Sequence, residues 1–172
     1  MVETAPYEVI RKDGAFEIRR YPEIIVAEVE QTQNSGFNTL FQYISGKNKS
    51  RSKISMTSPV ITTEKIAMTS PVMSTDDTMS FILPSGYTIE TTPEPTNSVI
   101  TIKKIQERTI ATVRFRGLAW KKEVEKQTTL LLEWLRAENI ELKGSVFLMQ
   151  YNPPFLPGFL RRNEIGVEID QD

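Results

Sequence analysis

The sequence predicts an α+β fold in which two helices pack on a mostly antiparallel sheet. Two observations lead to this prediction. Two segments show the i, i+3, i+4, i+7 apolar spacing of amphipathic helices, and the other ordered segments are short β-prone runs. The order of strands, one helix and strands also occurs twice, in about residues 7–84 and 99–170. We therefore expect one domain over residues 1–172, with pseudo-twofold symmetry between its halves.

The first half begins with three β-prone runs and then a helix. Asp13-Gly14 is a typical turn sequence between the first two runs. Asn34 or Ser35 is a suitable N-cap for the helix, and Gly46 is a suitable end. Apolar residues at Phe37, Leu40, Phe41 and Ile44 predict one buried helix face. The predicted elements are strands Tyr7–Ile10, Ala15–Tyr21 and Ile24–Glu30 and the helix Asn34–Gly46.

An eight-residue string then occurs twice with only one difference. Lys53–Val60 reads KISMTSPV, and Lys65–Val72 reads KIAMTSPV, 12 residues later. Proline lacks the amide proton that a strand ladder needs, so Pro59 and Pro71 are expected at strand ends, bulges or edges. A tandem duplication that lengthened a β-hairpin is one interpretation. We expect one copy in the regular position of the fold and the other in an inserted arm.

The second half restates the first with a longer helix. The loop Pro84–Asn97 separates the halves. We expect the Met-Thr-Ser-Pro of the first half to correspond to Gln150–Pro153 of the second. Trp120 and Trp134 are expected to pack the second helix on the sheet. The predicted elements are strands Thr78–Leu83, Val99–Lys104, Arg108–Phe115, Val146–Tyr151 and Glu164–Ile169, the helix Lys121–Glu138 and the loop Asn152–Gly158.

Composition excludes several kinds of chemistry. Apolar residues make up 39% of the chain and charged residues 25%, which is enough for a core. The chain has no cysteine, which excludes thiolate catalysis and Cys-ligated metals, and no histidine, the commonest general base and nitrogen ligand. The formal net charge is −1, no secretory signal precedes the first strand, and no apolar run reaches the ~20 residues of a membrane span. We expect a soluble cytoplasmic protein with no nucleic-acid or membrane partner.

Nine stretches in a fixed order resemble the SOUL family of haem-binding proteins. They extend from about residue 7 to about residue 169. They are Tyr7–Ile10, Phe16–Tyr21, Phe37–Asn48, the two Lys-Ile-x-Met-Thr-x-Pro-Val units, Thr78–Pro84, Phe115–Gly117, Tyr151–Pro154 and Arg161–Glu164. The resemblance implies a distorted antiparallel β-barrel with two helices, built from a duplicated βαββ-type unit and related to small-molecule effector-binding domains. It also implies binding of haem or another tetrapyrrole without a reaction of its own.

The resemblance implies a site that differs between branches of the family. One branch is thought to ligate haem iron through a histidine, but Arg20 stands at that position here, and arginine stays protonated. Another branch holds tetrapyrrole in an apolar groove along the first helix. Carried over by position, this groove consists of Asn34, Phe37, Phe41 and Gln42. The competing interpretation makes Phe37 and Phe41 ordinary core residues.

Charged groups near this helix have two interpretations as well. Lys47, Lys49, Arg51 and Lys53 either supply positive charge to the ligand or form a solvated loop. By motif, the nearest candidate iron ligands are Tyr21, Tyr43, Met56 and Met68, each of which also has a structural interpretation.

The last strand and its loop offer a different candidate site. Arg161, Arg162, Asn163 and Glu164 are expected to form charge-assisted hydrogen bonds that fix this loop. Alternatively, Glu164 faces a concave pocket and binds a cationic ligand. Phe155 and Phe159 are candidates for the mouth of a pocket.

The leading hypothesis is a non-catalytic protein that binds haem or another tetrapyrrole, without a histidine ligand, and buffers or delivers it. The alternative is an effector-binding module for a different, cationic small molecule anchored by Glu164. A third hypothesis, a hydrolase on the same scaffold, would need Glu or Tyr as its base because histidine and cysteine are missing. No catalytic or metal-binding residues are assigned.

Overall fold

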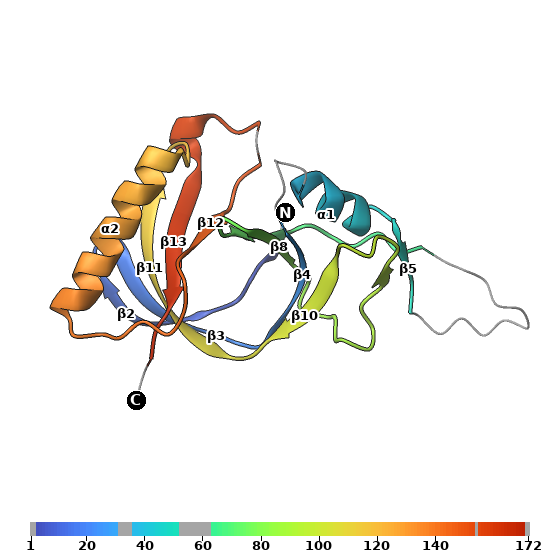
Figure 1. The fold of residues 1–172 in the computed structure, drawn as a ribbon, viewed down its shortest axis with the longest axis horizontal. Coiled ribbons are helices and arrows are strands. Elements are labelled where there is room, and N and C mark those ends of the chain that lie inside the picture. The colour runs from blue at the N-terminus through green and yellow to red at the C-terminus, as the bar shows by residue number, and fades with distance from the viewer. Residues whose placement is uncertain (1–2, 31–35, 52–62, 154, 171–172) are drawn as a thin grey trace, which may run out of the picture.

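The computed structural model describes residues 3–30, 36–51, 63–153 and 155–170. Its main sheet has nine strands, all paired antiparallel and curled into a half-barrel (Figure 1). They are β2 (Glu8–Asp13), β3 (Phe16–Tyr21), β4 (Ile24–Glu30), β7 (Val72–Ser74), β8 (Thr78–Ile82), β10 (Thr101–Ile105), β11 (Arg108–Arg116), β12 (Phe147–Gln150) and β13 (Arg162–Glu168). Their order across the sheet is β10-β4-β8-β7-β12-β13-β11-β3-β2.

This order contains the expected duplicated unit. The helices are α1 (Gly36–Ile44) and α2 (Lys121–Ala137). In the sequence β4–α1–β7–β8, strand β8 returns to lie between β4 and β7. In β11–α2–β12–β13, strand β13 returns in the same way to lie between β11 and β12. The two units meet where β7 pairs with β12, so the α+β fold with a repeated βαββ-type order is confirmed.

Each half also contributes a strand to the other half. Strand β3 precedes β4 in the chain but pairs with β11, whereas β10 precedes β11 but pairs with β4. Helix α1 packs on β4 and β8, and α2 packs on β11 and β13, so the helices cover opposite ends of the sheet (Figure 1). The halves therefore share one sheet.

Two smaller sheets complete the fold. Strand β1 (Glu3–Thr4) pairs in parallel with β6 (Thr69–Ser70), and β5 (Asn48–Lys49) pairs with β9 (Glu94–Pro95). Pro71 lies between β6 and β7 after a cis peptide bond, at a strand end as expected. This is the second copy of the repeated string. The first copy lies outside the described residues, so the inserted-arm prediction stays a prediction.

Two expectations about the second half were wrong. Trp134 stacks on Phe16, with ring centroids 4.9 Å apart, but Trp120 is 69% exposed. Trp120 stands just before α2 with extended backbone, so its side chain is not part of the helix face that packs. The predicted correspondence of Met68–Pro71 with Gln150–Pro153 also fails, because the former segment precedes β7 and the latter begins in β12 and runs past its end.

Candidate functional site

A groove of about 540 Å³ lies between α1 and the loop that follows β12. Residues from both halves meet here because β7 and β12 are antiparallel, with Val72 opposite Gln150. The residues before β7 and after β12 therefore emerge at the same end of the pair. We call this cavity the α1 groove. Its lining residues are Phe37, Phe41, Met68, Thr69, Ser70, Val72, Met79, Gln150, Tyr151, Asn152, Pro153, Phe155, Arg161 and Asn163.

One wall of the α1 groove is aromatic. Phe37 and Phe41 are one helical turn apart, and their rings are nearly parallel, with centroids 6.1 Å apart. Phe37 is 39% exposed and Phe41 is 47% exposed. The ring of Phe37 makes an edge-type contact with the buried ring of Phe81, at a centroid distance of 5.2 Å. Leu40 and Ile44 of the same helix are buried in the core, so the two phenylalanines form a separate, solvent-facing apolar surface.

The opposite wall is polar and is held by hydrogen bonds to the backbone. Arg161 Nε donates to the carbonyl of Leu156 at 2.8 Å, and Asn163 Nδ2 donates to the carbonyl of Gly117 at 2.7 Å. Asn152 Oδ1 accepts the backbone N–H of Arg162 at 2.6 Å. These bonds fix the loop after β12 and bring one guanidinium, that of Arg161, to the groove.

Behind this wall lies a buried carboxylate, Glu164, that is fully engaged. Its two oxygens accept hydrogen bonds from Arg19 Nη1 and Nη2, each at 2.7 Å. The hydroxyl of Tyr151, which lines the groove, donates to it at 2.6 Å, and Arg162 Nη2 donates at 2.8 Å. The expectation of charge-assisted hydrogen bonds is thus confirmed. The alternative, in which Glu164 faces a pocket and binds a cationic ligand, does not fit the structure, because Glu164 is fully buried and Arg19 is already its cationic partner.

The electrostatics of Glu164 follow from these contacts. Burial alone would raise its pKa, but the hydrogen bond and charge of Arg19, with the hydrogen bonds from Tyr151 and Arg162, lower the pKa to about 2. Burial and the contact with Glu164 raise the pKa of Tyr151 above its ordinary value. At neutral pH the pair is therefore an ionised carboxylate and a neutral phenol. A carboxylate with so low a pKa is a poor general base.

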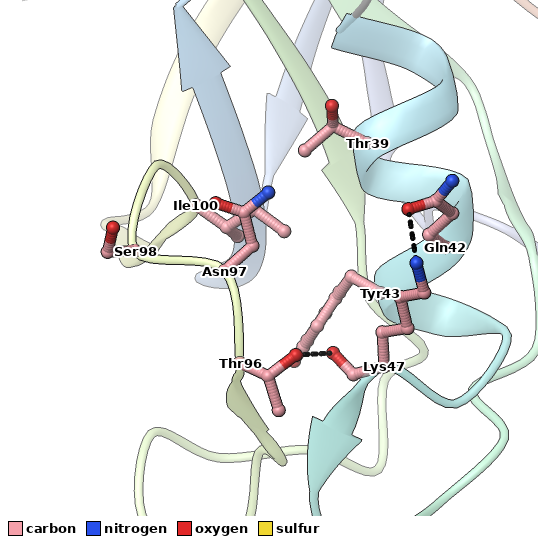
Figure 2. A pocket seen from close by; sticks show the side chains of 8 residues that line it. All are labelled: Thr39, Gln42, Tyr43, Lys47, Thr96, Asn97, Ser98 and Ile100. Carbon is pink, nitrogen blue, oxygen red and sulfur yellow. Dashed lines mark hydrogen bonds between the residues drawn. The ribbon is translucent and has the colours of Figure 1, made fainter.

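The structure brings together two of the four residues expected to form the site. Phe37 and Phe41 both line the α1 groove. Gln42 lines a different, polar pocket of about 380 Å³ on another side of α1, where Lys47 Nζ donates to its Oε1 at 3.0 Å (Figure 2). Asn34 lies outside the described residues.

The cation of the α1 groove comes from an unexpected segment. Lys47 lies in the polar pocket, Lys49 is exposed on β5, and Arg51 Nη1 donates to the carbonyl of Ile89. Lys53 lies outside the described residues. Arg161 lines the groove instead, although the sequence suggested only a structural role for it. Phe155, in the same loop, was predicted to lie at the mouth of a pocket and does line this groove. That prediction was the sequence signal that could have pointed to Arg161 as a groove residue.

Of the described candidate iron ligands, Met68 lines the α1 groove, whereas Tyr21 and Tyr43 are buried elsewhere. Tyr21 is buried, with its hydroxyl oxygen accepting from Arg19, and the buried Tyr43 donates to the carbonyl of Pro93 at 2.7 Å. Met68 lines the α1 groove, and Met56 lies outside the described residues. Arg20 forms surface ion pairs with Glu8 and Glu107 instead.

The described residues form neither a metal-binding cluster nor a membrane-spanning helix. Within the described ranges, no three or more Asp, Glu, His or Cys residues gather in a way that would hold a metal ion. Among the helices of the described residues, none has the length and apolarity needed to cross a membrane.

Comparison with known proteins gives sequence relatives along nearly the whole chain. The model of the family described as SOUL heme-binding protein matches residues 2–168. Heme-binding protein 2 of Mus musculus is 30% identical over 159 residues, which cover 88% of this chain and 77% of the mouse protein. Heme-binding protein 2 of Homo sapiens is 28% identical over 171 residues, covering 95% and 82%, respectively. Heme-binding protein 1 of Xenopus laevis is 28% identical over 162 residues, covering 90% and 84%.

Solved structures share the fold at low sequence identity. The C-terminal domain of EcmrR superimposes with a TM-score of 0.58 at 12% identity, over 96% of this chain and 99% of that domain. A hydrolase from Listeria innocua gives a TM-score of 0.59 at 9% identity, over 94% of each chain. At these identities the similarity concerns the fold alone.

Proposed function

This chain belongs to the SOUL heme-binding protein family, and we propose that it binds haem or another tetrapyrrole in the α1 groove without catalysing a reaction. Its role would be to buffer or deliver this ligand. The observation that carries the proposal is the pair of half-exposed, stacked rings of Phe37 and Phe41 on a cavity of about 540 Å³. Small-molecule sites typically have volumes of roughly 300–1,000 Å³ and apolar walls with a few polar groups.

The residues of the groove suit the chemistry of haem. Haem supplies a flat apolar macrocycle, a central iron and two carboxylates. The macrocycle would lie against Phe37 and Phe41, where burial of apolar area contributes roughly 25 cal/mol per Å². The guanidinium of Arg161 carries the positive charge that suits a carboxylate. Of the candidate iron ligands, Met68 lines the groove, and its thioether sulfur could coordinate the iron.

The absence of a catalytic role is supported by the state of Glu164, the carboxylate that Tyr151 connects to the groove wall. Glu164 is fully buried, ionised and hydrogen-bonded to Arg19, Tyr151 and Arg162. It has neither the exposure nor the pKa of a general base. The same contacts weigh against a cationic effector held by Glu164, since such a ligand would have to displace a buried arginine at considerable cost.

Titration with hemin tests the proposal. We expect a shift of the Soret band that saturates near one equivalent of hemin. Absorbance that rises without saturation would indicate adsorption to the surface, and the absence of any shift would remove haem as the ligand. A parallel titration with metal-free protoporphyrin, followed by fluorescence, reports whether the iron contributes to affinity.

A further inference from the structure

The exposed side chain of Trp120 belongs to a second apolar groove. This groove, of about 810 Å³, lies between the start of α2 and the 3₁₀ turn Gly158–Leu160. Trp120, Phe159 and Leu118 are 69%, 73% and 39% exposed, respectively, and all three line it. We call it the α2 groove. It shares no lining residue with the α1 groove.

The backbone holds the walls of the α2 groove together. A Cβ on Gly158 would lie 2.9 Å from Cγ of Leu118, so the 3₁₀ turn packs closely against this side chain and a larger residue at this position would force Leu118 to move. The backbone N–H of Gly117 donates to the carbonyl of Arg161, and that of Arg161 donates to the carbonyl of Gly158. The groove is therefore a formed feature of the fold that exists without a ligand.

The rim of the α2 groove is positively charged. Arg116, Lys122 and Lys126 line it and are exposed, whereas Glu123 is the acidic residue there and accepts a hydrogen bond from Gln127. None of the ion pairs within the described part of the chain includes these three cations. The whole chain carries a net charge of −1, so this excess of positive charge is local.

Helix stability does not account for this charge. Residues near the amino end of a helix are most favourable when acidic, because the helix dipole is positive there. Here α2 begins with Lys121 and Lys122, directly after the exposed Trp120. Features that disfavour local structure are expected at functional sites.

We propose that the α2 groove binds a free amphiphilic anion, namely an apolar chain that ends in an acidic head group. The chain would lie between Trp120 and Phe159 over Leu118. The head group would face Arg116, Lys122 and Lys126. The apolar walls of the groove suit an apolar chain, and the positive charge of its rim suits an acidic head group. The concave shape suits a single bound molecule. This site is additional to the proposed tetrapyrrole site. Either proposal can be wrong without affecting the other.

Trp120 itself reports on binding. The chain has two tryptophans, and replacing Trp134 by Phe keeps an aromatic ring on Phe16 while leaving Trp120 as the single tryptophan, which can be excited selectively. Monomeric dodecanoate is the probe, and dodecyltrimethylammonium is the matched cation. We expect a saturable blue shift of Trp120 emission with dodecanoate and at least tenfold weaker binding of the ammonium probe.

A charge reversal separates binding from folding. Lys122→Glu in the Trp134→Phe background should weaken dodecanoate binding about tenfold or more. It should leave the denaturation midpoint unchanged or raise it, because an acid is favourable at this end of α2. Lys49→Glu, at an exposed position of strand β5 in the other half, is the control and should bind dodecanoate as the parent does. Hemin binding should be the same in all three proteins.

Three outcomes would overturn the proposal. The first is equal binding of the anionic and the ammonium probe, which would mean simple hydrophobic adsorption. The second is unchanged dodecanoate affinity in Lys122→Glu. The third is a response to phosphatidylserine vesicles without any response to monomeric dodecanoate, which would make this face a membrane-contacting surface. If the Trp134→Phe protein binds dodecanoate but not hemin, the result would count against the tetrapyrrole site alone.

Discussion

The guanidinium of Arg19 donates hydrogen bonds to both carboxylate oxygens of Glu164, each at 2.7 Å, and neither side chain is exposed to solvent. Arg19 lies on β3 of the first half and Glu164 on β13 of the second, with β11 between these strands. The pair therefore ties the two halves together beneath the α1 groove, and Tyr151 connects it to the groove wall.

Removing the charge of Glu164 should be strongly destabilising. Glu164→Gln leaves the guanidinium of Arg19 buried with Glu17 as its remaining anionic partner among the described residues, and we expect a loss of about 3–5 kcal/mol in the free energy of unfolding. Glu28→Gln is the matched control, because its ion pair with the half-exposed Lys103 should contribute less than about 1 kcal/mol. Urea denaturation measures both. A loss below about 1 kcal/mol for Glu164→Gln would contradict the assigned role.

The same carboxylate should make the protein sensitive to acid. The pKa of Glu164 is about 2 in the folded protein, against 4.5 as the ordinary value. Its contribution to stability is therefore complete above about pH 4.5 and is lost as the pH falls toward 2. Because one pKa unit corresponds to about 1.4 kcal/mol, the contribution amounts to about 3 kcal/mol. Denaturant unfolding from pH 7 to pH 2.5 should reveal this decline, and Glu164→Gln should show a smaller one. Equal slopes for both proteins would assign the acid sensitivity to other groups.

Phe41→Ala should weaken hemin binding while costing little stability. The side chain is 47% exposed, so we expect a loss well below the ~3–5 kcal/mol of a buried phenylalanine. Hemin affinity should fall several-fold because part of the apolar wall is removed. Its neighbour Leu40 is fully buried, and Leu40→Ala should cost about 2–5 kcal/mol with affinity unchanged in the folded fraction. The reverse pattern, a large stability loss with unchanged affinity in Phe41→Ala, would move the site away from α1.

The ferric hemin complex should lack the low-spin signal of an iron with two nitrogen ligands. The chain has no histidine to ligate the iron. Arg20, which stands at the position of the ligand histidine of one family branch, forms ion pairs with Glu8 and Glu107 at the surface. Electron paramagnetic resonance measures the spin state directly. If Met68 ligates the iron, Met68→Leu should change the spectrum. A clean low-spin signal from two nitrogen ligands in the unmodified protein would contradict this account.

Much of the fold was predictable because its strands and helices follow simple periodicities. Strand β4 and the start of α2 agree with the predicted positions to the residue. The amphipathic pattern expected of the second helix is also present, because Leu131 and Leu135, one helical turn apart on α2, are both buried. The position of Trp120 was not predictable, because a residue just outside a helix does not follow the helix face.

The site was only partly predictable. Phe37 and Phe41 match family positions, but periodicity alone placed them on one face with Leu40 and Ile44. The structure separates them because the core beneath α1 takes Leu40, Tyr43 and Ile44 and leaves the two rings at its margin. Arg161 and Met68 reach the same groove only through the antiparallel pairing of β7 with β12, which no local pattern reveals.

Nuclear magnetic resonance with paramagnetic hemin tests the proposed tetrapyrrole site most directly. Ferric iron broadens nearby amide signals, and zinc protoporphyrin provides a diamagnetic reference for the same protein. We predict that substoichiometric hemin first broadens amides around Phe37, Phe41, Met68, Val72 and Tyr151, with zinc protoporphyrin shifting the same set. Broadening centred on Leu118 to Glu123, or spread evenly over the surface, would contradict a tetrapyrrole site in the α1 groove.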